Sequence, residues 1–314
     1  MIFTKTFSQL TKKSVSQAGG KGASLGEMTN AKIQVPPGFV VLVDTFERFI
    51  KEAGIVDDIQ AELNKVNYKD TNSIDRASNV IRDIISKSEM PKDIADSIQK
   101  SFKDLGAKFV AVRSSATAED SKTASWAGEL ETYLFVTKDN LLEQVKTCWS
   151  SLFTPRAIFY RHEKKLLNTK VSVAVVVQKM IDSEISGITF TVHPVTEDKN
   201  QMIIEAGYGL GESIVSGSIT PDSYIIDKKD ELILDISIQK QEKMMIIKSA
   251  KGGLKWSAIP KAKQEKQKLS GPKIMELAEL CIKIEKHYKH PQDIEWALEK
   301  GKLYILQSRP ITTL

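Results

Sequence analysis

The chain has 314 residues, 41% of them hydrophobic and 27% charged, and its 45 Lys and Arg against 40 Asp and Glu leave a net charge of +5. This composition is that of an ordinary globular protein, so collagen-like, low-complexity and disordered chains are excluded. There are only two cysteines, Cys148 and Cys281, and they form no Cys-x-x-Cys arrangement, so neither a disulfide framework nor a thiolate zinc site is expected. About two domains, or one domain of two lobes, are expected at this length.

The amino-terminal segment MIFTKTFSQLTKK carries polar residues where a signal peptide needs an apolar stretch. The longest apolar run, around 173–177, is far shorter than the roughly 20 residues that span a bilayer. We therefore predict a cytoplasmic protein with no membrane partner.

Up to about residue 105 the sequence favours helices, because polar segments carry apolar residues at helical spacing. The stripe Ile74, Ala77, Ile81 with Ile84 and Ile85 is the clearest case. The exception is 35–41, where two prolines and a glycine lead into an apolar strand.

A second strand is predicted at 109–113, running into a loop of small residues at 114–120. An extended segment at 131–136 and a helix at about 139–161 follow, with Asp139 placed to cap that helix.

From residue 171 the apolar period changes to that of strands. The predicted strands are 171–178, 186–192, 202–206, 223–227 and 232–238. The Lys-rich stretch 261–268 contains no aromatic residue, so it is interpreted as a solvated linker, and no nucleic-acid partner is predicted. A helix at about 273–288 and a hairpin of 293–297 and 303–309 complete the chain. The predicted fold class is α+β: a mostly helical first half and an antiparallel, sheet-rich second half, forming two lobes.

The first candidate for chemistry is the segment GGKGASLG at 19–26. Glycines let backbone N–H groups close around a phosphate, and Lys21 would add a mobile positive charge. The segment is not a P-loop, because Gly22 follows Lys21 where Ser or Thr is required. Two interpretations stay open: a turn that starts a helix, or a phosphate cradle.

The second candidate is Arg113, at the end of the strand 109–113. A planar guanidinium beside small hydroxyl residues suits bidentate phosphate recognition. The alternative is an arginine paired with Glu119 or Asp120.

The third candidate is the closing hairpin. Glu295, Gln307 and Arg309 fall on positions that would point into one space if the turn has an odd number of residues, with Glu295 opposite Ile305 and Asp293 opposite Gln307. A carboxylate and an amide oxygen are hard ligands suited to Mg²⁺ shared with phosphates. The alternative is an ordinary polar face.

Two further motifs are weaker. The segment GYGLGE at 207–212 has the wrong spacing for a dinucleotide fingerprint, although a glycine-rich anion loop stays open. The four histidines lack a completing Cys or carboxylate cluster, so structural or surface roles are expected for them.

Together, six blocks resemble the nucleotide-binding domain of the phosphoenolpyruvate synthase (pyruvate, water dikinase) family, which pyruvate phosphate dikinase and rifampicin phosphotransferase share. The blocks are GGKGASLGEM, VPPGFVV, FVAVRSSATAEDSKTASWAGELETYL, VQKMIDSEISGITFTVHP, GYGLGESIVSGSITPDSY and PQDIEWALEKGKLYILQSRPITT. They occur in a consistent order from about residue 2 to 313.

The resemblance implies an ATP-grasp fold, with an N-terminal lobe at 1–167, a C-terminal lobe at 168–314 and a hinge near 178–182. It also implies ATP and Mg²⁺ as ligands, with site residues at the matching positions. These are Lys21 and Arg113 for the phosphates, Gly128 and Thr132 in a loop over them, Gln178, Met180 and Ile181 at the adenine, Glu295 and Gln307 for Mg²⁺, and Arg309 for the phosphates.

In this family ATP first phosphorylates a histidine of a swivelling domain. None of the four histidines here lies in such a segment, and the pyruvate-binding barrel is absent too. The expected partner is therefore a phosphohistidine swivelling domain, in cis or in trans. The resemblance implies one ATP-binding domain of a phosphoenolpyruvate synthase-like phosphotransferase. A rifampicin phosphotransferase and a non-catalytic ATP-binding regulatory module are the alternatives.

Overall fold

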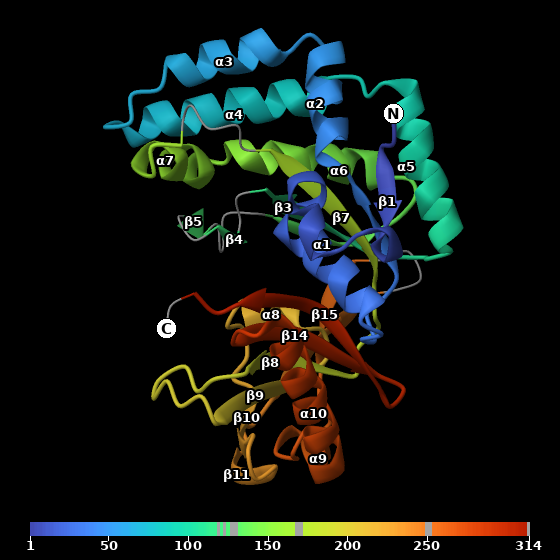
Figure 1. The fold of residues 1–314 in the computed structure, drawn as a ribbon, viewed down its shortest axis with the longest axis vertical. Coiled ribbons are helices and arrows are strands. Elements are labelled where there is room, and N and C mark those ends of the chain that lie inside the picture. Colours follow the sequence, from blue (N-terminus) through green and yellow to red (C-terminus); the bar gives the residue numbers. More distant parts are fainter. Residues whose placement is uncertain (118–119, 122–123, 126–130, 167–171, 249–252, 313–314) are drawn as a thin grey trace. The chain divides into compact units, whose positions relative to one another are not determined.

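The computed structural model describes residues 1–117, 120–121, 124–125, 131–166, 172–248 and 253–312. They form two compact units, each built around its own sheet (Figure 1). The first unit consists of Met1–Glu27 and Pro37–Met180, and the second of Met28–Pro36 and Ile181–Leu314. Helices combined with antiparallel sheets confirm the α+β class. The lobe division at 167/168 stays a prediction.

The first unit contains a five-stranded antiparallel sheet with the order β1-β2-β7-β3-β6. Its strands are β1 (Thr4–Thr6), β2 (Gly38–Val41), β3 (Val110–Ala116), β6 (Thr132–Val136) and β7 (Val173–Lys179). Its helices are α1 (Val15–Asn30, which ends in the second unit), α2 (Val43–Glu52), α3 (Val56–Asn64), α4 (Thr71–Lys87), α5 (Lys92–Leu105), α6 (Leu141–Ser150) and α7 (Pro155–Glu163). Short pieces are η1 (Phe7–Gln9), η2 (Lys12–Ser14), η3 (Ser151–Phe153) and the pair β4 (Asp120–Ser121) and β5 (Ala124–Ser125).

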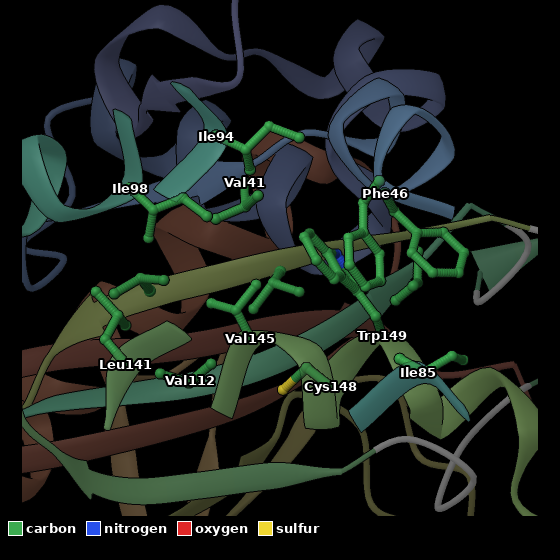
Figure 2. Packing of buried hydrophobic residues seen from close by; sticks show 14 of the residues in the cluster. Val41, Phe46, Ile85, Ile94, Ile98, Val112, Leu141, Val145, Cys148 and Trp149 are labelled. Carbon is green, nitrogen blue, oxygen red and sulfur yellow. The ribbon is translucent and has the colours of Figure 1, made fainter. Parts of the chain in front are cut away.

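The core of the first unit lies between this sheet and its helices. The stripe expected on α4 is confirmed, since Ile74, Ala77, Ile81 and Ile85 are buried. The Trp149 ring on α6 packs against Phe49, with ring centroids 5.0 Å apart, and close to Phe46 (Figure 2). Helix α6 contacts β3 and β7, and α4 contacts both α6 and α7 (Figure 1). A helical layer therefore covers one face of the sheet.

The second unit contains a six-stranded antiparallel sheet with the order β11-β10-β9-β8-β14-β15. Its strands are β8 (Ile185–Phe190), β9 (Gln201–Tyr208), β10 (Asp222–Asp227), β11 (Leu232–Ser237), β14 (Gln292–Glu299) and β15 (Lys302–Pro310). The helix α10 (Gly271–Tyr288) buries Ile274, Leu277, Cys281 and Ile284 beside β9 and β14. The remaining elements are α8 (Glu212–Val215), the hairpin β12 (Lys243–Ile247) and β13 (Leu254–Ala258), and α9 (Lys261–Gln264).

Two local predictions in the first unit are wrong. The helix expected at 139–161 breaks between α6 and α7, because Pro155 has no N–H to donate and Thr154 starts a new helix by accepting from the Ala157 N–H at 3.2 Å. Asp139 does not cap α6: Asn140 occupies that position, and its side chain accepts from the Thr137 N–H instead.

The interpretation of 261–268 as a solvated linker fails at its last residue, although 261–267 are exposed or half-buried. Lys268 is buried, and its Nζ lies 2.7 Å from Oδ1 of the buried Asp222, so this end of the stretch is tied to β10. Periodicity did not reveal the Lys268–Asp222 pair or the β12–β13 hairpin. Within the described ranges, none of the helices has an apolar stretch long enough to cross a bilayer.

Candidate functional site

Arg113 lies in the middle of β3, not at its end. The strand continues through Ser114, Ser115 and Ala116, which are buried, so the predicted loop begins later than expected. Arg113 is directly opposite Thr132 of β6 on one side and Val176 of β7 on the other. Since directly opposite residues of antiparallel strands share a face, with Cα atoms about 4.5–5.5 Å apart, the structure brings Arg113 and Thr132 together.

The glycine segment docks against the same face of β3. Gly19 breaks α1 with φ 65°, and a Cβ there would lie 2.2 Å from the Ser115 carbonyl oxygen, so only glycine fits this approach. The Ser115 hydroxyl donates to the Ala18 carbonyl (3.0 Å) and accepts from the Gly22 N–H (3.3 Å). Ser115 is two residues from Arg113, and alternation along a strand places both side chains on one face.

This docking places Lys21 close to β3. The residue stands half-buried in the turn between Gly19 and Gly22, where the regular part of the helix begins. Its charge reaches the helical layer: burial raises the pKa of the Cys148 thiol, Glu131 adds to the rise, and Lys21 opposes it. Structurally the segment is a helix-start turn. Because Gly22 N–H is used by Ser115, the amides of the turn are only partly available to a phosphate.

The segment 178–181 joins the two units. Gln178 is 2% exposed and lies opposite Ala111 of β3, which puts it on the same sheet face as Arg113. Its Nε2 has no hydrogen-bond partner among the described residues, and a buried amide donor without a partner is costly unless a ligand accepts from it. Met180 N–H donates to the Phe109 carbonyl (3.1 Å), and its Sδ accepts from the Phe135 N–H (3.0 Å). Ile181, 7% exposed, begins the second unit.

Gly128, the remaining predicted residue of the loop over the phosphates, lies outside the described residues.

The closing hairpin corrects the predicted register. Glu295 is directly opposite Gln307, and Asp293 is opposite Arg309, whereas Glu295 had been expected opposite Ile305. The register shifts between Glu295 and Trp296, and Ile305 instead pairs with Trp296, both fully buried. Glu295 and Gln307 therefore share one face more closely than the sequence indicated.

Asp293 was not predicted as a site residue, although it lies two positions before Glu295 on the same face. Its Oδ2 accepts from Arg309 Nη2 (2.7 Å) and Nε (2.9 Å), which holds the Arg309 guanidinium against β14. Burial raises the pKa of the Asp293 carboxyl, Arg309 opposes the rise, and Glu295 adds to it. On β9, burial and Asp293 likewise raise the pKa of Glu205.

The donor set on this sheet face fits a magnesium ion bound together with phosphates. One carboxylate and one amide oxygen, from Glu295 and Gln307, are hard donors, and Mg²⁺ in nucleotide sites takes one or two carboxylates plus phosphate oxygens. Besides burial, the nearby charges of Asp293 and Glu295 contribute to the raised pKa values of Glu205 and Asp293, respectively, and a cation there would offset these charges. In the part of the chain that the structure describes, no group of three His, Cys, Asp or Glu residues forms a metal cluster.

The glycine loop at 207–211 gives no support to an anion-binding role. Gly209 N–H donates to the Glu184 carbonyl and Leu210 N–H to the Met245 carbonyl, both at 2.9 Å. These amides connect the loop to neighbouring backbone.

The predicted residues thus form two sets, each assembled inside its own unit. The first unit holds Lys21, Arg113, Thr132, Gln178 and Met180, and the second holds Ile181, Glu295, Gln307 and Arg309.

Comparison with known proteins gives the class. The family model described as pyruvate phosphate dikinase, AMP/ATP-binding domain, matches residues 15–314, so the chain belongs to this family.

The full-length relatives are named as two kinds of enzyme. A probable phosphoenolpyruvate synthase of Methanocaldococcus jannaschii is 47% identical over 100% of this chain and 27% of its own length. A phosphoenolpyruvate synthase of Pyrococcus furiosus is 41% identical over 99% of this chain and 44% of its own length. A rifampicin phosphotransferase of Bacillus cereus is 39% identical, over 99% and 36%. The chain therefore spans less than half the length of these relatives.

Proposed function

We propose that this chain is the ATP-binding part of an ATP-dependent phosphotransferase of the phosphoenolpyruvate synthase type, and that the residues of each set contribute to the binding of ATP with Mg²⁺. One observation carries the proposal. In each unit the predicted ligands are cross-strand partners, Arg113 with Thr132 and Glu295 with Gln307, within a family of AMP/ATP-binding domains.

In this proposal the chain acts by positioning and by charge neutralisation. Lys21, Arg113 and Arg309 would hold the phosphate oxygens and offset their charge as it shifts during transfer. Bound at Glu295 and Gln307, Mg²⁺ would supply Lewis-acid stabilisation of the same oxygens. The Asp293 carboxylate holds Arg309 through two hydrogen bonds to one oxygen, which limits the positions that the guanidinium can take.

The adenine would meet the segment 178–181. The buried Gln178 amide can donate to a ring nitrogen, which would satisfy an Nε2 that has no partner among the described residues. Buried Ile181 offers an apolar contact to the ring. These two contacts are of the kind that small-molecule pockets use for orientation.

The family resemblance implies that the whole enzyme would convert ATP, pyruvate and water to phosphoenolpyruvate, AMP and phosphate. As the family resemblance implies, the bond between the α- and β-phosphoryl groups of ATP breaks, the pyrophosphoryl group bonds to a histidine of a swivelling domain, and AMP leaves. Water then takes one phosphoryl group and pyruvate the other. The second candidate is a rifampicin phosphotransferase, favoured by the Bacillus cereus relative.

Labelled ATP tests the first step. The chain is incubated with Mg²⁺, ATP labelled in the β-phosphoryl group and a histidine-bearing swivelling domain. We expect AMP release and labelled carrier, both abolished in Arg113→Ala and in Glu295→Ala but retained in Arg76→Ala, an exposed arginine on α4. Label transfer at wild-type rates in Arg113→Ala or Glu295→Ala would overturn the mechanism. Binding of ATP without AMP release would assign a non-catalytic module instead.

The acceptor is assigned with the full-length gene product. Pyruvate-dependent AMP formation supports the synthase, and rifamycin-dependent AMP formation supports the antibiotic phosphotransferase.

A further inference from the structure

Glu131 lies at the junction between the β6 strand and the segment before it. β6 is an edge strand, paired only with β3 in the sheet order. Three hydrogen bonds connect Glu131 to Ser114: the Ser114 N–H and hydroxyl each donate to the Glu131 carbonyl (3.1 Å), and the Glu131 N–H donates to the Ser114 hydroxyl oxygen (2.9 Å). These bonds stand next to the Arg113–Thr132 pair along both strands.

The Glu131 carboxylate is anchored to the helical layer. Arg82 of α4 donates from Nη2 to both carboxylate oxygens, at 3.0 and 3.2 Å, and the Tyr133 hydroxyl donates to Oε2. The Arg82 and Glu131 side chains are only 28% and 29% exposed, so water screens this pair less than a surface pair. Burial, and then Glu131, raise the pKa of Tyr133 well above its ordinary value, which keeps its O–H in place as a donor.

The other end of β6 is irregular. The register of β3 against β6 shifts between Val110 and Val112, and Phe135 adopts φ 61°, a left-handed conformation that is rare for a bulky residue. The regular pairing of β3 with β6 therefore covers few residues, and the pairing of Thr132 with Arg113 depends on the contacts of Glu131.

Alternation along the strands puts the Glu131 side chain and Thr132 on opposite faces. Glu131 and Arg82 thus face the helices, while Arg113 and Thr132 face the other side of the sheet.

From these contacts we infer that Arg82 and Glu131 are positioning residues for the phosphate contacts of the first unit. Their ion pair holds the residue before β6 against α4. The Glu131–Ser114 hydrogen bonds then fix the adjacent pair, Arg113 and Thr132, in register. The inference rests on the proposed function, since it needs a triphosphate bound at these two residues.

The test compares triphosphate with monophosphate binding, because AMP has one phosphate group where ATP has three. Affinities of the full chain for Mg²⁺·ATP and for AMP are measured by calorimetry in wild type, Glu131→Gln, Arg82→Met and the double variant. Asp93→Asn is the control. Arg48 also comes from a helix of the first unit and is 26% exposed, and the substitution neutralises one of its two carboxylate partners, Asp93 at 2.7 Å, while Glu52 remains.

Each single variant is expected to lose about tenfold or more in ATP affinity, the loss expected for one hydrogen-bonded charge pair, with AMP affinity changing less than about threefold. The double variant should bind ATP no more weakly than the weaker single, because both remove the same pair. Asp93→Asn should bind both nucleotides like wild type.

Three results would overturn the inference. The first is unchanged ATP affinity in Glu131→Gln, and the second is equal loss of ATP and AMP affinity, which is the signature of a merely structural pair. If Glu131→Gln does not fold, Arg82→Lys, which keeps the charge, is compared with Arg82→Met instead. The third result is that Arg82→Lys binds ATP no more tightly than Arg82→Met. Failure of the wild type to bind ATP is a separate result, and it would refute the proposed function itself.

Discussion

Glu295 and Gln307 are direct cross-strand partners only because the register of β14 against β15 shifts beside them. Pairing that begins at the turn sets Trp296 opposite Ile305, and its regular continuation would set Glu295 opposite Leu306. The extra residue on β15 turns Gln307 to the face of Glu295. A bulge that re-aims a side chain in this way is common beside functional sites.

Glu295→Gln should uncouple ATP binding from Mg²⁺, because the variant keeps the shape of the side chain but loses the charged ligand. We expect Mg²⁺ to raise the ATP affinity of the wild type. In the variant this increase should be smaller by about tenfold or more, because one charged contact is lost. Calorimetric titrations with and without Mg²⁺ measure it, with Glu276→Gln on α10 as the control. Equal strengthening by Mg²⁺ in wild type and Glu295→Gln would argue against this metal site.

Gly19→Ala should destabilise the first unit more than Gly106→Ala. Both glycines have a positive φ, 65° and 63°. Gly106, with ψ 23°, lies in the left-handed region, where alanine costs about 1–2 kcal/mol. Gly19, with ψ 177°, lies in a region that is essentially restricted to glycine, where alanine costs about 1–3 kcal/mol. Only at Gly19 does the added Cβ meet backbone, 2.2 Å from the Ser115 oxygen, and such overpacking adds about 1–3 kcal/mol. Urea unfolding of the two variants gives the difference, and equal losses would show that the turn is not docked on β3 as described.

Lys268→Met should strongly destabilise the second unit. The substitution leaves Asp222 as a buried charge without its ammonium partner, a change that costs about 3–5 kcal/mol. Lys240→Met breaks an exposed pair with Glu242, and little loss of stability is expected because water screens such pairs. Chemical denaturation compares them, and similar losses in both variants would contradict burial of the Lys268–Asp222 pair.

The contrast between these two lysines shows what the sequence could predict and what it could not. Helical stripes such as Ile74–Ile85 and most strands of the second unit follow from local periodicity, because burial on one face leaves a repeat in the sequence. Lys268 lies among exposed lysines, and its partner Asp222 is 46 residues away, so no local pattern distinguishes it.

The candidate site divides in the same way. The residue types at Lys21, Arg113, Glu295 and Gln307 indicate phosphate and metal chemistry, and the family match supports that class. The exact partners depend on register, and the one-residue shift between Glu295 and Trp296 has no signature in the side-chain pattern. Asp293 could have been identified as the partner of Arg309 only once that register was known.

Glu205→Gln should stabilise the protein at neutral pH and lose this advantage in acid. Burial, with Asp293 nearby, raises the pKa of Glu205 above its ordinary value of about 4.3, so the folded state binds this proton more tightly than the unfolded chain. Wild-type stability therefore falls as pH rises through the folded pKa, a penalty that glutamine does not carry. Unfolding midpoints at about pH 4 and pH 7 test the sign. Glu279→Gln, exposed on α10, is the control, and a variant less stable than wild type at neutral pH would contradict the effect.

The central claim is that Arg113 and Glu295 each contribute to the binding of Mg²⁺·ATP. Calorimetric titration of Mg²⁺·ATP into wild type, Arg113→Ala and Glu295→Ala tests it most directly. The account predicts a loss of about tenfold or more in affinity from either substitution, since each removes a charged contact to the ligand. Full ATP affinity in Arg113→Ala or in Glu295→Ala would contradict it.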